Sequence, residues 1–272
     1  MDYHIIVNGG LGNQMFQYAL YLTLKERGHS IRLDTSLYNY VDTHNGYELE
    51  RVFGIKEPLI CRRGLHLIWL RLLMKGYLKP ITTKDSFVYD KKIINSPRAY
   101  IIGYWQSEKY FAVIKNKVRE VFAFRNIDHY NYSIAEEMNN CNSVGIHIRR
   151  GDYLTSGMTL VRDDYYRNAI RYIKEYVSSS VFYVFSDDQE EAISIMDSTN
   201  VPYKLITHNN GEDSYKDMFL MSQCKHNIIC NSSFSWWGAW LGNYKAGIVV
   251  APQEWVADRP ELCPQLDEWI KI

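Results

Sequence analysis

The stretch Val-Gly-Ile-His-Ile-Arg-Arg-Gly-Asp-Tyr-Leu at residues 144–154 decides the fold of this 272-residue chain. Its apolar residues Val144, Ile146 and Ile148 come at every second position, which predicts a β-strand. The strand leads directly into two arginines, a glycine and an aspartate. Open α/β sheets bind their ligands beyond the carboxyl ends of the strands, so these polar residues fall where a site is expected.

The two adjacent arginines, Arg149 and Arg150, are candidate ligands of a phosphate group. Each guanidinium offers a planar fork of donors that suits phosphate oxygens. Gly151 allows the backbone to turn sharply, and Asp152 places a carboxylate beside the positive charge. The pattern predicts a diphosphate clamp with an acid or base, Asp152, next to it. A surface ion pair between arginine and aspartate at a strand end is the alternative reading.

The part of the chain after residue 140 alternates strands with helices. Strands are predicted at 144–148, 181–186, 203–206, 227–230 and 247–250. Helices are predicted at 163–177, 189–197, 213–224 and 234–243. This alternation implies parallel crossover connections and a doubly wound sheet. The carboxyl ends of parallel strands share one edge, so several candidate residues should meet there: Arg149, Arg150, Asp187, Asp188, Ser232 and Ser233.

A glycine-rich turn at residues 8–13 separates a predicted strand from a predicted helix that begins at Gln14. With the next strand, these elements form a βαβ unit. Glycines let a ligand approach the backbone, and the amino terminus of a helix favours an anion. The candidate binding residues here are Gly10, Gly12, Asn13 and Gln14. The third glycine of the dinucleotide fingerprint is missing, and such turns also occur with nothing bound.

A polar run from Asn126 to Asn142 separates the two halves of the chain. We therefore predict an N-terminal Rossmann-like domain at 1–139 and a C-terminal one at 140–272. The candidate phosphate ligands of the second domain predict that it binds an anionic ligand. In the first domain, residues 35–60 carry no firm pattern.

The composition excludes several classes of protein. The 31 basic and 31 acidic residues balance, with a pI near 7.1, which argues against a nucleic-acid-binding surface. The five cysteines include no Cys-x-x-Cys pair, so the spacing favours free thiols over a disulfide framework or a zinc site. The chain enters strand-like residues at once and contains no apolar run long enough to cross a membrane, which predicts a soluble, cytoplasmic protein.

Residues 59–80 combine five basic residues with leucines and other apolar residues, and they contain no acidic residue. A basic, apolar helix of this kind is typical of peripheral contact with an anionic membrane, which we consider for residues 61–80. An ordinary helix packed on the core gives the same pattern.

Three stretches of the chain resemble the α1,2-fucosyltransferase family. His-Ile-Arg-Arg-Gly-Asp-Tyr at 147–153 is similar to the central signature of that family. Gly-Gly-Leu-Gly-Asn-Gln-Met-Phe-Gln-Tyr-Ala at 9–19 resembles its amino-terminal motif, and Asn-Ser-Ser-Phe-Ser-Trp-Trp-Gly-Ala-Trp-Leu at 231–241 its carboxyl-terminal motif. The resemblance implies an α/β fold of the GT-B type, with two facing Rossmann-like domains built on parallel sheets. It implies that the second domain binds the sugar donor and that the first holds the acceptor.

The resemblance also assigns roles to residues of the second half. It places Arg150 on the β-phosphate with Arg149 nearby, and His147 in the nucleotide pocket. Arg150 and Asp152 are therefore the candidate catalytic residues. It pairs Asp217 with the guanine edge, where a carboxylate favoured by the helix dipole is the alternative explanation. The glycine-rich turn is also expected to bind GDP-fucose, through Gly10, Gly12, Asn13 and Gln14. The remaining candidates for binding GDP-fucose are Asp187, Ser232, Ser233, Phe234 and Ser235, and simple helix capping is the alternative for the serines.

The function implied is inverting, metal-independent transfer of L-fucose from GDP-β-L-fucose to the 2-hydroxyl of a terminal galactose, without a cofactor. The general base is the least defined role, since Asp152 can instead orient an arginine. The acceptor expected is an oligosaccharide or a lipid-linked glycan, reached by a bacterial enzyme in the cytoplasm at the inner face of the membrane. The alternatives are another GDP-sugar donor such as GDP-mannose, a non-catalytic sugar-binding protein and, least favoured, adhesion through Arg150-Gly151-Asp152.

Overall fold

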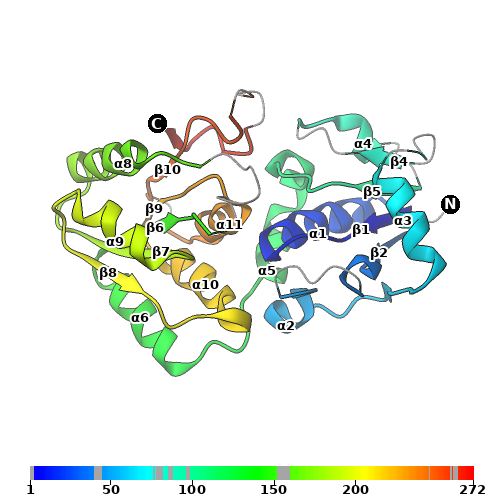
Figure 1. Cartoon of the computed structure of the whole chain (residues 1–272), viewed down its shortest axis with the longest axis horizontal. Coiled ribbons are helices and arrows are strands. Elements are labelled where there is room, and N and C mark those ends of the chain that lie inside the picture. The colour runs from blue at the N-terminus through cyan, green and yellow to red at the C-terminus, as the bar shows by residue number, and fades with distance from the viewer. Residues whose placement is uncertain are drawn as a thin grey trace. The chain divides into compact units, whose positions relative to one another are not determined.

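The computed structural model describes residues 3–39, 45–75, 77, 82–84, 88–95, 99–151, 160–244, 246–257, 259 and 263–272. The chain forms two compact units, Met1–Arg125 and Asn126–Ile272 (Figure 1). Both are α/β units built on a parallel sheet, as the sequence predicted. None of the helices in these ranges is long and apolar enough to span a membrane.

The first unit contains a five-stranded parallel sheet with the order β3-β2-β1-β5-β4. Its strands are β1 (Tyr3–Ile6), β2 (Ile31–Asp34), β3 (Leu59–Ile60), β4 (Thr82–Lys84) and β5 (Tyr100–Ile102). Its α-helices are α1 (Leu11–Glu26), α2 (Leu49–Phe53), α3 (Leu65–Met74), α4 (Lys91–Asn95) and α5 (Lys115–Val121). Helix α1 is apolar on nearly every side and is buried over almost its whole length, as expected of a helix at the centre of a core.

The second unit contains a six-stranded parallel sheet with the order β11-β10-β9-β6-β7-β8. Its strands are β6 (Asn142–Ile148), β7 (Ser180–Ser186), β8 (Tyr203–Ile206), β9 (His226–Ile228), β10 (Val249–Ala251) and β11 (Ile270–Lys271). Its α-helices are α6 (His129–Asn139), α8 (Asp163–Tyr176), α9 (Gln189–Asp197), α10 (Tyr215–Gln223) and α11 (Ser233–Leu241). The chain moves outward from β6 to β8 and returns to β9 on the other side of β6, so the strand order reverses between β6 and β9. Such a switch point is where doubly wound sheets bind their ligands.

The two faces of β6 have different surroundings. Val144, Ile146 and Ile148 belong to one core cluster with residues of α8 and α9, including the fully buried Tyr166 and Ile173. Burial of one such aliphatic side chain contributes roughly 1.5–3 kcal/mol. Successive strand residues point to opposite faces, so His147 lies on the other face, toward α11.

Two differences from the sequence-based prediction have physical causes. Helix α1 begins at Leu11 instead of Gln14, because the glycine-rich turn ends at Gly10 and the remaining residues form the first helical turn. The two units divide after Arg125, whereas the sequence placed the boundary at residue 139. Helix α6 packs against β6 and α10 and therefore belongs to the second unit.

Candidate active site

The two arginines that follow β6 point in different directions and have different partners. The guanidinium of Arg150 donates from Nη1 to the carbonyl oxygen of Val161 at 2.6 Å and from Nη2 to the Asp163 carboxylate at 2.5 Å. It also lies 5.9 Å from the centre of the Tyr166 ring, and the side chain is 6% exposed. Arg150 is thus packed on the face covered by α8, where it ties the strand end to that helix.

Arg149 lies on the opposite face and is more accessible, with 24% of its side chain exposed. Its Nε lies 3.1 Å from Oδ2 of Asp187, which follows β7. The other oxygen of Asp187 accepts the backbone N–H of Arg150 at 2.9 Å. A Cβ at position 151 would lie 2.8 Å from Oδ2 of Asp187, which explains the glycine there. Asp187 therefore holds both the backbone and the first guanidinium of the Arg-Arg-Gly turn.

His147 is buried beside this arginine. Its Nδ1 lies 3.1 Å from the sulfur of Cys230, and its ring centre lies 5.6 Å from that of Phe234 on α11. Burial, together with the positive charge of Arg149, lowers the pKa of His147 to about 3. Burial raises the pKa of the Cys230 thiol to about 12. At neutral pH both groups are uncharged, so Arg149 is the cation that this part of the site offers to a ligand.

The four residues predicted at the amino terminus of α11 divide into two pairs. Ser232 caps the helix by accepting the backbone N–H of Phe234, and Ser235 is fully buried with its hydroxyl directed to the Ser232 carbonyl oxygen at 3.2 Å. Ser233 and Phe234 are half-buried. Capping thus accounts for Ser232, and the positive end of the helix dipole remains at Ser233 and Phe234.

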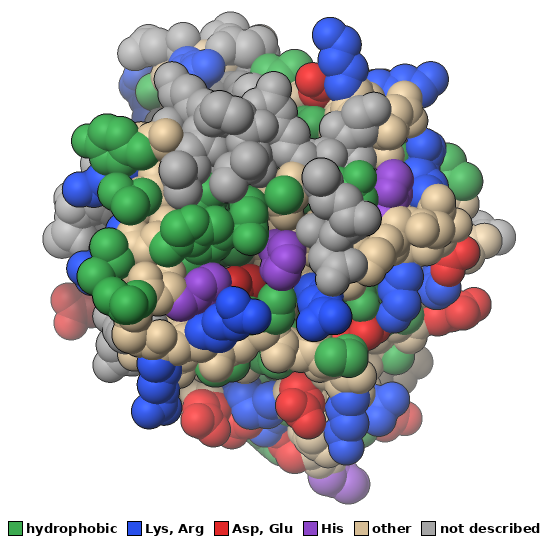
Figure 2. Space-filling model, turned by 90° about the vertical axis from the view of Figure 1, so that its right-hand side faces the viewer, with side chains coloured by type: hydrophobic (Ala, Val, Ile, Leu, Met, Phe, Trp, Pro, Cys, Tyr) green, Lys and Arg blue, Asp and Glu red, His purple; other side chains and the backbone are tan. Residues whose placement is uncertain are grey.

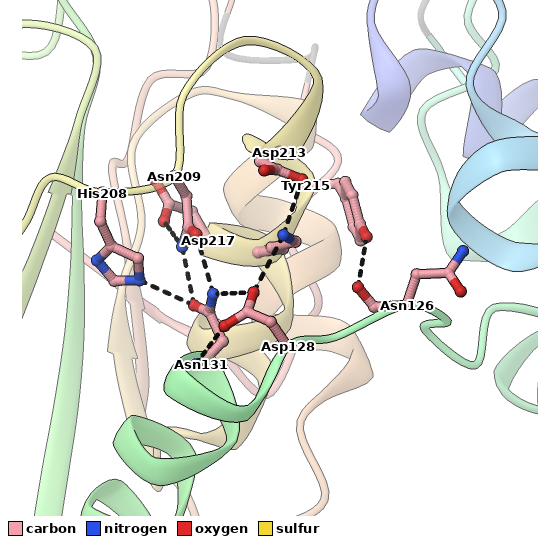
Figure 3. A network of polar contacts seen from close by, with 9 residues as sticks. Asn126, Asp128, Asn131, His208, Asn209, Asp213, Tyr215 and Asp217 are labelled. Carbon is pink, nitrogen blue, oxygen red and sulfur yellow. Dashed lines mark hydrogen bonds and ion pairs between the residues drawn. The ribbon is translucent and has the colours of Figure 1, made fainter.

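Asp217 lies in the first turn of α10, beside Asn209 (Figure 3). Its Oδ1 accepts a hydrogen bond from Nδ2 of Asn209 at 2.8 Å. Burial raises the pKa of Asp217 to about 7, and the bond from Asn209 partly opposes that shift. A desolvated carboxylate with one neutral donor has capacity to accept further N–H groups.

Many polar groups of the glycine-rich segment form hydrogen bonds to other groups of the first unit. Gln14 is fully buried, donates to the carbonyl oxygens of Gly9 and Gly46, and accepts the backbone N–H of Glu48. The buried Glu48 carboxylate accepts the backbone N–H of Leu11, so the amino terminus of α1 already holds a carboxylate of its own chain.

The other three residues predicted in this segment differ in exposure. Gly12 is buried, and Gly10 and Asn13 are half-buried. The Oδ1 of Asn13 accepts a hydrogen bond from Gln106 at 2.8 Å. Asn13 is therefore the predicted side chain of this segment with the most access to a ligand.

The other two sequence-based predictions for the site concern Asp152 and the absence of a metal. Asp152 lies outside the described residues. Within the described ranges, no group of three His, Cys, Asp or Glu side chains is arranged to hold a metal ion.

The partners that organise the site were not predicted from sequence. Asn131 and Asn209 are buried and bonded to each other although 78 residues separate them. Glu48 comes from a segment without a firm pattern. Isolated asparagines and glutamates occur throughout the chain, so their sequence carries no signal of these contacts.

The whole chain, residues 1–272, matches the sequence profile of glycosyl transferase family 11. The chain belongs to glycosyl transferase family 11. It is 38% identical to an alpha-1,2-colitosyltransferase of Escherichia coli, over 97% of this chain and 96% of that protein. It is 32% identical to the O-antigen biosynthesis glycosyltransferase WbnK of Escherichia coli, over 98% and 99%. The human galactoside alpha-(1,2)-fucosyltransferase 1 is 23% identical over 97% of this chain and 73% of that protein.

Solved structures support the fold of this family 11 glycosyltransferase. The α-1,6-fucosyltransferase NodZ of Bradyrhizobium, soaked with GDP-fucose, matches with a TM-score of 0.53 and 17% identity, over 89% of this chain and 93% of that one. A family 9 glycosyl transferase of Veillonella parvula matches with a TM-score of 0.52 and 12% identity, over 100% and 86%. The predicted architecture of two Rossmann-like domains is confirmed.

Proposed function

We propose that this glycosyltransferase moves L-fucose from GDP-β-L-fucose to the 2-hydroxyl of a terminal galactose, with inversion at the transferred carbon. The observation that carries the proposal is Arg149, held by Asp187 at the switch point of the second sheet beside the neutral His147. A partly exposed guanidinium at this edge suits the diphosphate that leaves when the sugar is transferred.

In this proposal Arg149 bonds the diphosphate as negative charge accumulates on it. One well-placed donor of this kind contributes roughly a hundred- to a thousandfold in rate. The positive end of α11, at Ser233 and Phe234, adds to the stabilisation of that charge. Arg150 takes a positioning role, since its guanidinium is committed to Val161 and Asp163.

Asp217 is proposed to recognise the base. A carboxylate can accept both N1–H and the 2-amino group of guanine, whereas adenine offers no such pair of donors. His147 lines the same nucleotide pocket as an uncharged ring. Asp152 is proposed as the base that takes the proton of the acceptor hydroxyl.

The acceptor is proposed to be a galactose-terminated oligosaccharide or lipid-linked glycan, met in the bacterial cytoplasm at the inner face of the membrane. Residues of the first unit are proposed to select it, with the Asn13–Gln106 amide pair as the candidate contact. Amides of this kind bond sugar hydroxyls as donors and as acceptors.

A second candidate donor carries colitose, because a relative 38% identical over nearly the whole chain is an alpha-1,2-colitosyltransferase. Colitose is L-fucose without its 3-hydroxyl, so one pocket can accept either sugar unless it bonds that hydroxyl. A site that does bond the hydroxyl rejects the deoxy sugar strongly, because its own polar groups are then left unpaired.

One experiment tests both candidates. The purified protein is incubated with GDP-fucose, GDP-colitose or GDP-mannose and with lactose or lacto-N-biose, in the presence and absence of EDTA. We expect α1,2-linked product from GDP-fucose, unchanged by EDTA. A kcat/KM at least tenfold higher with GDP-colitose would assign the second candidate, and turnover lost on chelation would contradict metal independence.

A further inference from the structure

Helix α3 exposes an apolar row that the first unit does not cover. Its inward face, formed by Leu67, Leu70 and Leu73, packs on the core. Its outward face presents Leu65, Ile68 and Leu72, which are 82%, 55% and 40% exposed. These positions follow the spacing i, i+3, i+7 and therefore share one side of the helix. His66 anchors the helix to Asp34 at the end of β2, with 2.9 Å between Nε2 and Oδ2.

Positive charge accompanies the apolar row. Four basic residues on and beside the helix are exposed: Arg62, Arg63, Arg71 and Lys75. No acidic residue occurs between Glu57 and Asp85 in the sequence. Figure 2 views the side of the molecule that carries α3 in Figure 1, where hydrophobic side chains lie beside Lys and Arg. Isolated apolar residues are ordinary on a protein surface, but three in a row with uniform charge form a patch.

We propose that this face of α3 binds an anionic lipid surface. A helix with exposed leucines and flanking cations inserts its apolar side among the acyl chains near the headgroups, while each Lys or Arg near the surface adds electrostatic attraction. A second copy of this chain fits less well, because two such faces would bring like charges together. The inference is independent of which sugar the enzyme transfers.

Vesicle flotation tests the lipid contact. Wild type and two variants, Leu65→Ser/Ile68→Ser/Leu72→Ser and Arg62→Glu/Arg63→Glu, are mixed with phosphatidylglycerol-containing vesicles or with pure phosphatidylcholine vesicles. We expect wild type to float with the anionic vesicles only, and each variant to bind at least tenfold more weakly. Val113→Ser/Tyr176→Ser is the matched control, since both side chains are exposed elsewhere and should not affect binding.

Two results would overturn the lipid proposal. One is equal flotation of wild type and both α3 variants. The other is a dimer of wild type, in the absence of vesicles, that the leucine variant abolishes, because that result assigns the face to a second copy. Activity on soluble lactose and the melting temperature, both expected to stay near wild type, show that the variants are folded.

A second observation, in the other unit, concerns how Asp217 is held (Figure 3). Asn131 and Asn209 form a reciprocal amide pair: Asn131 Nδ2 donates to Asn209 Oδ1 at 3.1 Å, and Asn209 Nδ2 donates to Asn131 Oδ1 at 3.0 Å. Asn131 Nδ2 also donates to the carboxylate of Asp128 at 2.8 Å. Because that carboxylate only accepts, the amide of Asn131 has one permitted orientation.

The orientation of the Asn131 amide determines which atom of Asn209 faces Asp217. With its oxygen bound by Asn131, the amide of Asn209 must turn its Nδ2 toward Asp217, where it donates at 2.8 Å. The charged and titratable groups around the pair are Lys216, which bridges Asp128 and Asp213 at 3.0 and 2.8 Å, and His208, whose Nε2 lies 3.1 Å from Asn131 Oδ1. Partial burial lowers the pKa of His208, and the nearby Asp128 carboxylate opposes that shift.

We infer that Asn209 is a positioning residue that presents Asp217 as an ionised acceptor to the 2-amino group of guanine. The inference rests on the proposed function, since it requires a guanine nucleotide. The fixed donor stabilises the carboxylate form of Asp217 in a site where burial otherwise favours the neutral acid. Without that donor, the pKa of Asp217 would rise further, which favours the neutral acid, and the neutral acid cannot accept both guanine N–H groups.

Calorimetric titration with GDP and with IDP, which lacks the 2-amino group, tests this role between pH 6.5 and 8.5. Wild type should bind GDP at least tenfold more tightly than IDP at pH 7.5. Asn209→Leu and Asn209→Asp should lose most of that preference at pH 7, and Asn209→Leu should regain it toward pH 8.5 as Asp217 ionises. Asn210→Ala is the matched control, because Asn210 is exposed and bonds the Thr207 carbonyl oxygen.

The possible results distinguish a failure of guanine recognition from a failure of the positioning role of Asn209. Wild type that binds neither nucleotide, or binds both equally, overturns the proposed guanine recognition. Wild type with the preference, but Asn209 variants that keep it at every pH, overturns the positioning role alone. An equal loss for GDP and IDP at all pH values would show that Asn209 has a structural role only.

Discussion

Asp187 binds Arg149 through one carboxylate oxygen, at 3.1 Å, and the backbone N–H of Arg150 through the other, at 2.9 Å. One side chain after β7 thus fixes both the direction of a guanidinium and the path of the turn after β6. The two neighbouring arginines therefore have different roles. Arg149 faces the edge of the sheet, and Arg150 connects that edge to α8.

The first prediction concerns Arg149. Arg149→Ala should reduce kcat by a hundred- to a thousandfold and weaken GDP binding, because the charge that faces the diphosphate is removed. Steady-state kinetics and GDP titration measure the effect. Arg162→Ala is the control, since that side chain is 84% exposed on the surface. An Arg149→Ala enzyme with near-normal kcat would remove the basis of the proposed clamp.

Arg150→Ala should act mainly on stability. The substitution leaves Asp163 and the Val161 carbonyl oxygen without their donor and opens a gap beside Tyr166, so the loss should be about 3 kcal/mol. Urea denaturation measures the free energy of unfolding. Activity should fall less than in Arg149→Ala when both are assayed well below their melting temperatures. A larger loss of activity in Arg150→Ala than in Arg149→Ala would assign the catalytic role to Arg150.

The third prediction separates the two possible roles of Asp152. Asp152→Asn should abolish transfer while leaving GDP affinity near normal, because a general base acts on the acceptor and not on the nucleotide. Activity assays and GDP titration on the same preparation make the comparison. A parallel loss of GDP affinity would mean that Asp152 organises the phosphate site instead.

Gly151→Ala should disturb the turn itself. The added Cβ would lie 2.8 Å from the carboxylate of Asp187 and must push that side chain away from Arg149. We expect a loss of activity of roughly ten- to a hundredfold, with GDP affinity reduced as well, since orientation of the donor is part of its effect. Gly28→Ala tests the specificity of the effect, because no atom lies within 4 Å of a Cβ there, although its positive φ adds strain. Equal activity of Gly151→Ala and wild type would show that the Asp187–Arg149 contact is dispensable.

The last prediction concerns acid stability. His147 has a pKa of about 3 in the folded protein and close to 6.5 when unfolded, so the unfolded state binds the extra proton first. Above pH 6.5, His147 is neutral in both states and does not affect the free energy of unfolding. As the pH falls from 6.5 toward 3, the free energy of unfolding decreases by about 1.4 kcal/mol per pH unit for this one proton. His147→Phe should flatten this part of the pH dependence of the free energy of unfolding between pH 4.5 and 7.5. Parallel curves for both proteins would contradict a buried, neutral His147.

The local patterns of the sequence predicted most of the regular structure. The apolar alternation of Val144, Ile146 and Ile148 predicted the central strand, and strands separated by helices predicted the parallel sheet of the second unit. The outer strands β3, β4 and β11, of two or three residues each, were not predicted. The helix α3 was predicted as a basic, apolar segment, but its sequence did not show which leucines would be covered.

The sequence by itself determined that two arginines and a glycine follow a buried strand, because chain order and the apolar alternation of a strand are local properties. Only the tertiary structure decided that Arg149 meets Asp187, that Arg150 turns to α8, and that Glu48 occupies the amino terminus of α1. The pleat of a strand sends neighbouring side chains to opposite faces. What each side chain then meets depends on segments that are distant in the sequence and are brought together only by packing.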